Sequence, residues 1–114
     1  MPSGNLLVDA SAARATTGTG NAVATSDSAR ISWYVNVTAT SGTPNMVLSV
    51  EWSHDGSTWA TADSADTMTA ITSTANGTLV KSFPVRAPYA RLRWTITGST
   101  PSLTFSTRAH LADA

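Results

Sequence analysis

Residues 31–39 read Ile-Ser-Trp-Tyr-Val-Asn-Val-Thr-Ala, and residues 46–52 read Met-Val-Leu-Ser-Val-Glu-Trp. In both stretches large apolar side chains alternate with smaller or polar ones, a period typical of a half-buried β-strand. The same period recurs over residues 79–83, 90–97 and 102–109. With weaker candidates near the N-terminus, these stretches predict an all-β domain: a single antiparallel β-sandwich or jelly roll of about seven or eight strands.

Glycine-containing sequences separate the predicted strands. Residues 41–45 (Ser-Gly-Thr-Pro-Asn) predict a loop, and Asp55-Gly56 predicts a tight hairpin turn with residues 58–61 as the returning strand. Residues 63–77 are compatible with a short strand or a loop, and they end in a second turn sequence, Asn76-Gly77. The predicted core consists of the large side chains on the apolar faces: Trp33, Val35, Leu48, Val50, Trp52, Leu92, Trp94, Ile96, Leu103 and Phe105.

The N-terminal region lacks a strong strand pattern. We expect residues 1–20 to form an extended arm and residues 21–114 to form the β-sandwich domain. An arm of this kind orders on binding to a neighbouring subunit. Its deletion should therefore weaken attachment and leave the melting temperature nearly unchanged.

Composition excludes several classes of protein. Of the 114 residues, 52 are Ser, Thr or Ala, and seven acidic side chains balance seven basic ones. A neutral chain is a poor nucleic-acid binder. The absence of cysteine excludes disulfides and thiolate metal sites. Apolar runs such as Met46-Val47-Leu48 are far shorter than the roughly 20 residues of a membrane-spanning helix. No secretory signal is recognisable, which favours synthesis in the cytoplasm.

Residues with catalytic potential are few. His54 and His110 are the only histidines, and Glu51 is the only glutamate. A turn or loop position is the simpler explanation for both histidines, and Asp63 and Asp66 lack the spacing of a known calcium loop. We therefore expect no catalytic residue, no metal and no cofactor.

Candidate partner-binding residues lie in the arm and around one predicted strand. Tyr89, Arg91 and Arg93 share a strand face, which offers either a basic contact surface or a solvated face with an arginine paired to Glu51. The full candidate set is Leu6, Leu7, Arg14, Arg86, Tyr89, Arg91 and Arg93. For a carbohydrate-binding protein, the candidate sugar-stacking residues are Trp59 and Tyr34.

Two resemblances involve particular motifs. Residues 50–59 (Val-Glu-Trp-Ser-His-Asp-Gly-Ser-Thr-Trp) and 90–94 (Ala-Arg-Leu-Arg-Trp) resemble the hairpin and following strand of galactose-binding-like (discoidin) jelly rolls. Residues 6–14 (Leu-Leu-Val-Asp-Ala-Ser-Ala-Ala-Arg) and 100–106 (Thr-Pro-Ser-Leu-Thr-Phe-Ser) resemble small β-sandwich structural proteins of tailed bacteriophages. The phage resemblance covers nearly the whole chain, and neither motif contains a catalytic residue.

The phage resemblance implies a non-enzymatic virion protein. We expect a capsid decoration (cement) protein that binds the outer face of the major capsid lattice in many copies or as a homo-oligomer, without nucleic acid or membrane. A tail or head–tail joining protein, or a galactose-binding-like carbohydrate-binding module, remains an alternative.

Overall fold

The computed structural model describes residues 4–25, 28–61 and 66–112, and over these residues the chain is almost entirely antiparallel β-structure. This confirms the predicted all-β class. The elements are β1 (Gly4–Arg14), β2 (Gly18–Thr19), β3 (Val23–Ala24), β4 (Arg30–Ser53), the 3-10 turn η1 (Thr74–Asn76), β5 (Thr78–Pro84) and β6 (Tyr89–Ala112). None of the described residues forms a helix long and apolar enough to cross a membrane.

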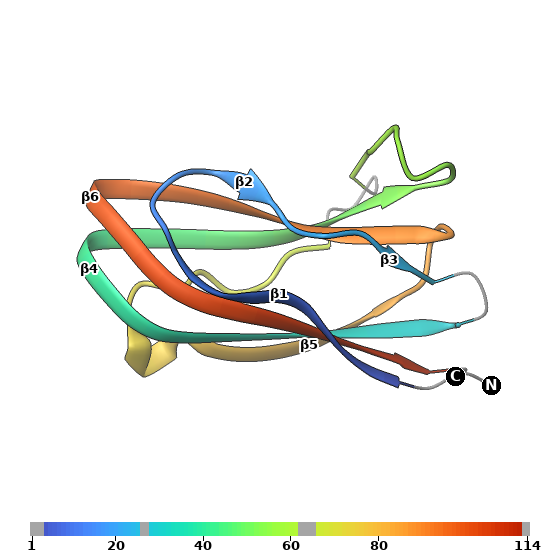
Figure 1. Ribbon diagram of the computed structural model, residues 1–114, viewed down its shortest axis with the longest axis horizontal. Helices are drawn as coiled ribbons and strands as arrows, with labels where there is room; N and C mark the ends of the chain where they lie inside the picture. Colours follow the sequence, from blue (N-terminus) through green and yellow to red (C-terminus); the bar gives the residue numbers. More distant parts are fainter. Residues whose placement is uncertain (1–3, 26–27, 62–65, 113–114) are drawn as a thin grey trace.

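Two long strands, β4 and β6, build both layers of the molecule. Each has 24 residues, and they pair with each other from Arg30↔Ala112 to Ser53↔Tyr89. The paired strands fold back on themselves midway (Figure 1). The eleven steps along the chain from Trp94 to Phe105 would span about 36 Å in a straight strand, yet the centres of the two rings lie 5.2 Å apart, edge to face. The bend therefore turns one ladder into two packed layers.

Layer A, as we name it, contains β1, residues 102–112 of β6, residues 30–41 of β4, and β5, in that order. Layer B contains β2 and β3, which pair with residues 89–94 of β6, and residues 43–53 of β4. On the far side of β4, the described residues extend layer B through the isolated bridges Met46↔Ile71, Ser49↔Thr67 and Trp52↔Ala60. The link from β1 to β2 closes one side of the sandwich.

Glycines stand where the two long strands bend. Gly42 has φ 70° and Gly98 has φ 118°, in the region that favours glycine. Register shifts between Val37 and Ala39 and between Ser41 and Thr43 accompany the bend, as bulges do in strongly curved strands. The loop predicted over residues 41–45 is therefore wrong, because these residues stay paired with β6 while changing direction.

The core lies between the layers. All ten predicted core residues are buried, and the core also includes Ile31, Met46, Met68, Ile71 and Phe83. The prediction succeeded because side chains on alternate positions of a strand reach the same face. Burial of this apolar surface is the main stabilising contribution.

Two expectations differ from the structure. The returning strand predicted over residues 58–61 is reduced to the Trp52↔Ala60 bridge, because the segment leaves the layer directly after its turn. The segment expected to form an arm, residues 1–20, is in its described part paired with β6: β1 runs along layer A and β2 along layer B. Alternation is hidden in β1 because register shifts between Leu7 and Asp9 and between Asp9 and Ala12 interrupt it.

Candidate partner-binding surfaces

The outer face of layer A carries a row of exposed side chains across its four strands, three of them apolar and one an arginine. Leu7 pairs with Arg108, Arg108 with Tyr34, and Tyr34 with Val80. Directly paired residues point to the same face of a sheet, and the exposed fractions are 54% for Leu7, 37% for Tyr34 and 67% for Val80. These are three of the four large apolar side chains that the described residues expose. We call them, with Arg108, the layer A row.

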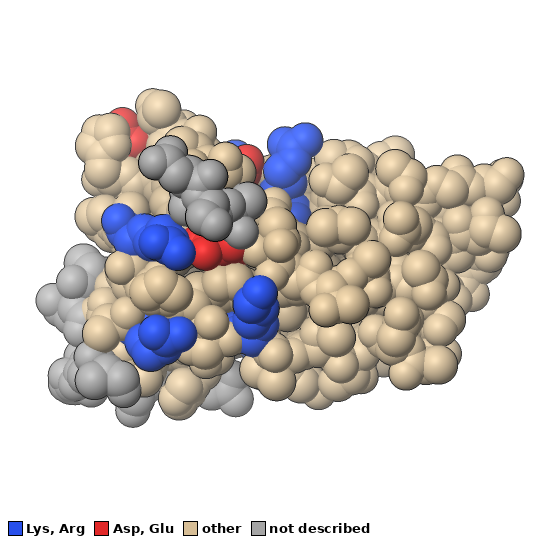
Figure 2. Space-filling view, turned by 180° about the vertical axis from the view of Figure 1, so that it is seen from behind, with Lys and Arg blue, Asp and Glu red and all other residues tan. Residues whose placement is uncertain are grey.

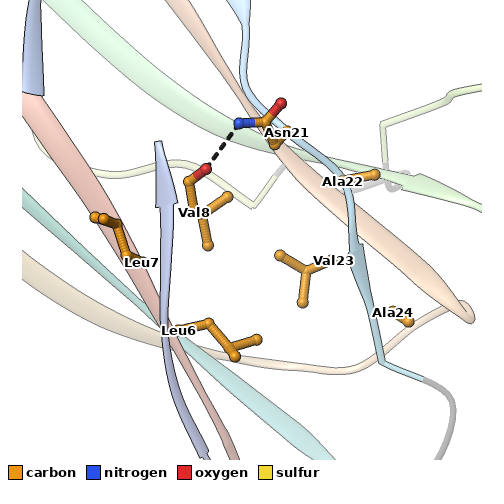
Figure 3. Close-up of a pocket in the computed structure, with 7 residues that line it drawn as sticks. All are labelled: Leu6, Leu7, Val8, Asn21, Ala22, Val23 and Ala24. Atoms are coloured by element: carbon orange, nitrogen blue, oxygen red, sulfur yellow. Dashed lines mark hydrogen bonds between the residues drawn. The ribbon is translucent and has the colours of Figure 1, made fainter. Parts of the chain in front are cut away.

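A second apolar surface is a groove on the side of the sandwich, between β1 and β3 (Figure 3). It has a volume of about 380 Å³ and is lined by residues 6–8 and 21–24. Leu6, which is 42% exposed, pairs with buried Ala109 and so points to the inner side, away from Leu7. Figure 3 shows the Leu6 and Val23 side chains between the two strands. Exposed leucine in an apolar hollow is typical of a protein contact site.

Buried Asp9 positions the walls of this groove. Its carboxylate accepts a hydrogen bond from Thr107 Oγ1 at 2.7 Å and others from the Asn21 backbone N–H at 2.9 Å and Asn21 Nδ2 at 3.1 Å. Asn21 Nδ2 also donates to the carbonyl of Val8 at 2.7 Å (Figure 3). A Cβ on Gly20 would collide with the Asp9 carboxylate, so the close approach requires glycine there. The contacts hold β1 and the segment before β3 at a fixed distance.

Arg14 lies against the core rather than projecting outward as a contact residue. Its guanidinium donates to the carbonyls of Phe105 at 2.6 Å and Ala10 at 3.0 Å. It also lies 4.2 Å from the Phe105 ring centre and 5.0 Å from that of Trp94. Burial lowers the pKa of Arg14, and the negative charge of Asp9 opposes that shift. Arg14 thus closes the side of the sandwich where β1 leaves layer A.

Arg86 is tied to a carboxylate at one end of the sandwich. Its Nε and Nη2 donate to Asp66 at 2.7 and 3.0 Å, and Trp52 Nε1 donates to the same carboxylate at 2.9 Å. The hydrogen bonds from Arg86 hold the pKa of Asp66 below its usual value, and Asp66 in turn raises that of Arg86. Asp66, weighed above as a calcium ligand, is committed to this cluster, and Asp63 lies outside the described residues.

Tyr89, Arg91 and Arg93 share the outer face of layer B, as predicted. Arg91 Nε donates to Glu51 Oε1 at 2.8 Å, which confirms the paired alternative, and its guanidinium lies 4.3 Å from the Trp59 ring centre. Tyr89 is half-buried beside the turn at Gly56, and Arg93 is exposed. Among these residues Arg93 is therefore the most accessible cation.

The sugar-stacking candidates are not brought together. Trp59 contacts Arg91 on the outer face of layer B, whereas Tyr34 lies on the outer face of layer A. One ring face of Trp59 is already covered by a guanidinium. A single sugar ring cannot contact both aromatics, so the pair does not form one stacking site.

Both histidines lie at exposed positions, His54 in a turn and His110 in β6, whereas Glu51 is buried against Arg91. His54, whose side chain is 82% exposed, has its Nε2 4.0 Å from an oxygen of Asp55. Asp55 accepts backbone N–H bonds from Thr58 and Ser57 and a hydroxyl bond from Ser53, and these bonds lower its pKa to about 2. Asp55 thus holds the turn. No cluster of three metal-ligating side chains occurs within the part of the chain that the structure describes.

Charged side chains are concentrated in one half of the molecule, with Arg14, which pairs with Leu103 near the bends, as an exception. Figure 2 shows the lysine, arginine and acidic side chains of that view near the end that holds the loops, while the half with the strand bends carries none. The stretches 31–50, 67–80 and 94–107 contain no charged residue. Hydroxyl and small side chains cover the bends instead.

Comparison with solved structures shows where this architecture recurs. The PBSX exported protein XepA superposes with a TM-score of 0.58 at 14% identity, covering 94% of this chain and 36% of that one. A chain from Bacillus endospore appendages, described as disulfide-linked pili, reaches a TM-score of 0.46 at 18% identity and covers 99% of this chain and 88% of that one. No family model and no curated protein matches. The chain spans about a third of XepA, and the likeness concerns the fold.

Sequence reasoning missed the layer A row and the role of Asp9. Leu7, Tyr34 and Val80 lie in three strands that are far apart in sequence, and only the strand register aligns them. An available signal was that Tyr34 and Val80 occupy polar-face positions of otherwise alternating strands. Large apolar residues at such positions indicate a contact face.

Proposed function

We propose that this chain is a non-enzymatic structural protein of a bacteriophage-related particle, and specifically a decoration protein on the capsid surface. The fold that it shares with the phage-related PBSX exported protein XepA supports the phage class. The sequence resemblance to small β-sandwich proteins of tailed phages points the same way. Attachment to a tail, or at the head–tail joint, is the closest variant.

The observation that carries the proposal is the apolar groove between β1 and β3. Its exposed Leu6 suits an extended apolar segment of the major capsid protein, because the side chains of such a segment would fill the hollow. The hydrogen bonds of Asp9 and Asn21 keep the groove open before a partner protein binds. Attachment in many copies needs only modest affinity at each site.

The experiment uses capsids and tails purified separately from particles of the phage that encodes the chain. Tagged protein is mixed with each fraction and pelleted through a cushion. We expect the wild-type chain to pellet with capsids in hundreds of copies, as repeated lattice sites require. Leu6→Asp places a charge in the groove and should reduce the bound amount about tenfold.

Thr95→Asp is the matched control, because it adds the same charge at an exposed position on layer B. It should bind as the wild type does. Recovery of the wild-type chain only from the supernatant with both fractions would reject the structural role. Pelleting with tails alone would reject capsid decoration and retain the tail variant.

A further inference from the structure

The order of side chains in the layer A row allows it to pair with a second copy of the same row that runs in the opposite direction. Across β1, β6, β4 and β5 it reads Leu7, Arg108, Tyr34, Val80: apolar, cationic, aromatic, apolar. When a second copy of the row faces the first in the opposite direction, each leucine lies on a valine and each guanidinium lies on a tyrosine ring. Guanidinium–aromatic contacts are favourable, more so when water is excluded.

We propose that a second copy of this chain docks on the outer face of layer A, with the two copies related by a two-fold axis parallel to the strands. Leu7 then lies on Val80 of the second copy, and Arg108 lies on Tyr34 of the second copy. The contact is isologous, with the same patch used on both sides. Layers of sandwiches pack face to face in this way at a small angle.

The side chains of the neighbouring rows on the same face are compatible with this arrangement. Arg30 pairs with Ala112, and Ser32 pairs with His110. The same reversal sets each Arg30 over Ala112, and each His110 over Ser32, of the other copy. No arginine of the face then meets its own counterpart. An axis along the rows would instead set Arg108 against Arg108, which like-charge repulsion disfavours.

The size of the face predicts a weak contact. Four strands spaced about 4.8 Å apart make a row roughly 15 Å long, and about seven residues along each strand cover roughly 23 Å. The two copies together would bury on the order of 700 to 1,000 Å², below the roughly 1,200 Å² of standard specific interfaces and in the range of weak, transient contacts. Association should therefore be reversible in solution and strengthened where copies are held side by side.

Sedimentation velocity of the purified chain over roughly 10 µM to 1 mM tests this contact, since small interfaces dissociate in that range. We expect concentration-dependent dimers. Leu7→Asp or Val80→Lys alone should weaken association about tenfold. The two substitutions combined in one chain should restore it, because each new charge then faces its opposite across the interface.

Controls keep this test interpretable. Both positions are exposed, so the variants should melt as the wild type does. Thr95→Lys, on the outer face of layer B, should dimerise normally. A wild-type chain that stays monomeric at 1 mM, or a double variant as weak as the single ones, would overturn the proposal.

Cysteine cross-linking tests the axis, because the chain contains no cysteine of its own. A chain carrying both Leu7→Cys and Val80→Cys should be joined into dimers by a short bis-maleimide, and Leu7→Cys alone should not, because facing layers lie about 10 Å apart, beyond the reach of a direct disulfide. In the proposed arrangement the two copies of position 7 lie roughly 18 Å apart, from three strand spacings along the sheet and about 10 Å between the layers. Efficient cross-linking of Leu7→Cys alone would overturn the arrangement.

These measurements use no particles, so they are independent of the capsid proposal. If the wild type is monomeric and Val80→Lys abolishes pelleting with capsids, the face belongs to the capsid and self-association is rejected. If dimers form and Leu6→Asp does not affect pelleting, the inference on layer A stands and the groove is not the attachment site.

Discussion

At the scale of single residues, most charged side chains that suggested a contact surface are engaged within the molecule. Arg14 binds carbonyls and rings, Arg86 binds Asp66, and Arg91 binds Glu51. Each contact joins segments that are distant in sequence, and the pair formed by Arg86 and Asp66 fastens the end of layer B. Charge-assisted hydrogen bonds of this kind are stronger than neutral ones. Removing one partner leaves the other buried without a hydrogen bond, which lowers the free energy of unfolding.

Acid should weaken the fold through Asp66. Its pKa is lowered in the folded state by Arg86, so its stabilising contribution is complete above the unfolded value of about 3.9 and is lost as pH falls toward the folded value. Urea unfolding between pH 2 and pH 6 measures this, and Asp66→Asn should flatten the acid limb and reduce stability by about 1–2 kcal/mol at neutral pH. An unchanged acid limb would contradict this role. The Asp55→Asn variant measures how much of the pH dependence of stability comes from Asp55 in the turn, whose pKa is also lowered.

At the scale of elements, the bends of β4 and β6 determine the architecture. The bends require glycine at Gly98, where φ is 118° and a Cβ would collide with the carbonyl of Thr43. Gly56 also has a positive φ of 81°, but a Cβ there would meet only the Tyr89 ring at 3.8 Å. A substitution at Gly56 therefore tests the cost of the backbone conformation alone, whereas a substitution at Gly98 adds the cost of a steric collision.

Gly98→Ala should destabilise the protein clearly more than Gly56→Ala. We expect about 1 kcal/mol for the Gly56 variant, from the backbone conformation alone, and about 3 kcal/mol or more for the Gly98 variant. Chemical unfolding followed by tryptophan fluorescence provides both values. Equal losses would mean that the bend relaxes around the added methyl group.

The pairing of β1 changes the expected result of N-terminal truncation. Deleting residues 1–14 removes eight cross-strand pairs with β6 and the Arg14 contacts, and uncovers Phe105. The truncated chain should unfold at a much lower temperature or fail to fold, in contrast to the nearly unchanged melting expected of a free arm. Calorimetry decides between the two, with deletion of residues 1–3 as the control that leaves β1 intact.

At the scale of the whole molecule, the layers share their central strands and cannot unfold separately. Amide hydrogens of β4 and β6 should therefore exchange at similar rates in both layers, through global unfolding. The amides of residues 60, 68 and 71, which donate to β4 carbonyls at the isolated bridges, should exchange faster, since single bridges open locally. Hydrogen exchange resolved by residue tests this, and a layer B that exchanges well before layer A would show two independent units.

The sequence by itself determined the β-class, the alternating faces and the ten core residues, because these depend on the period of two. It left open which arginine pairs with Glu51, and the structure shows that it is Arg91. It did not determine that β4 and β6 each pass through both layers, since glycine is typical both of loops and of bent strands. The tertiary structure alone aligned Leu7, Arg108, Tyr34 and Val80 and placed Arg14 against Phe105. Those contacts arise from long-range strand pairing, in which the partners are separated by up to about a hundred residues.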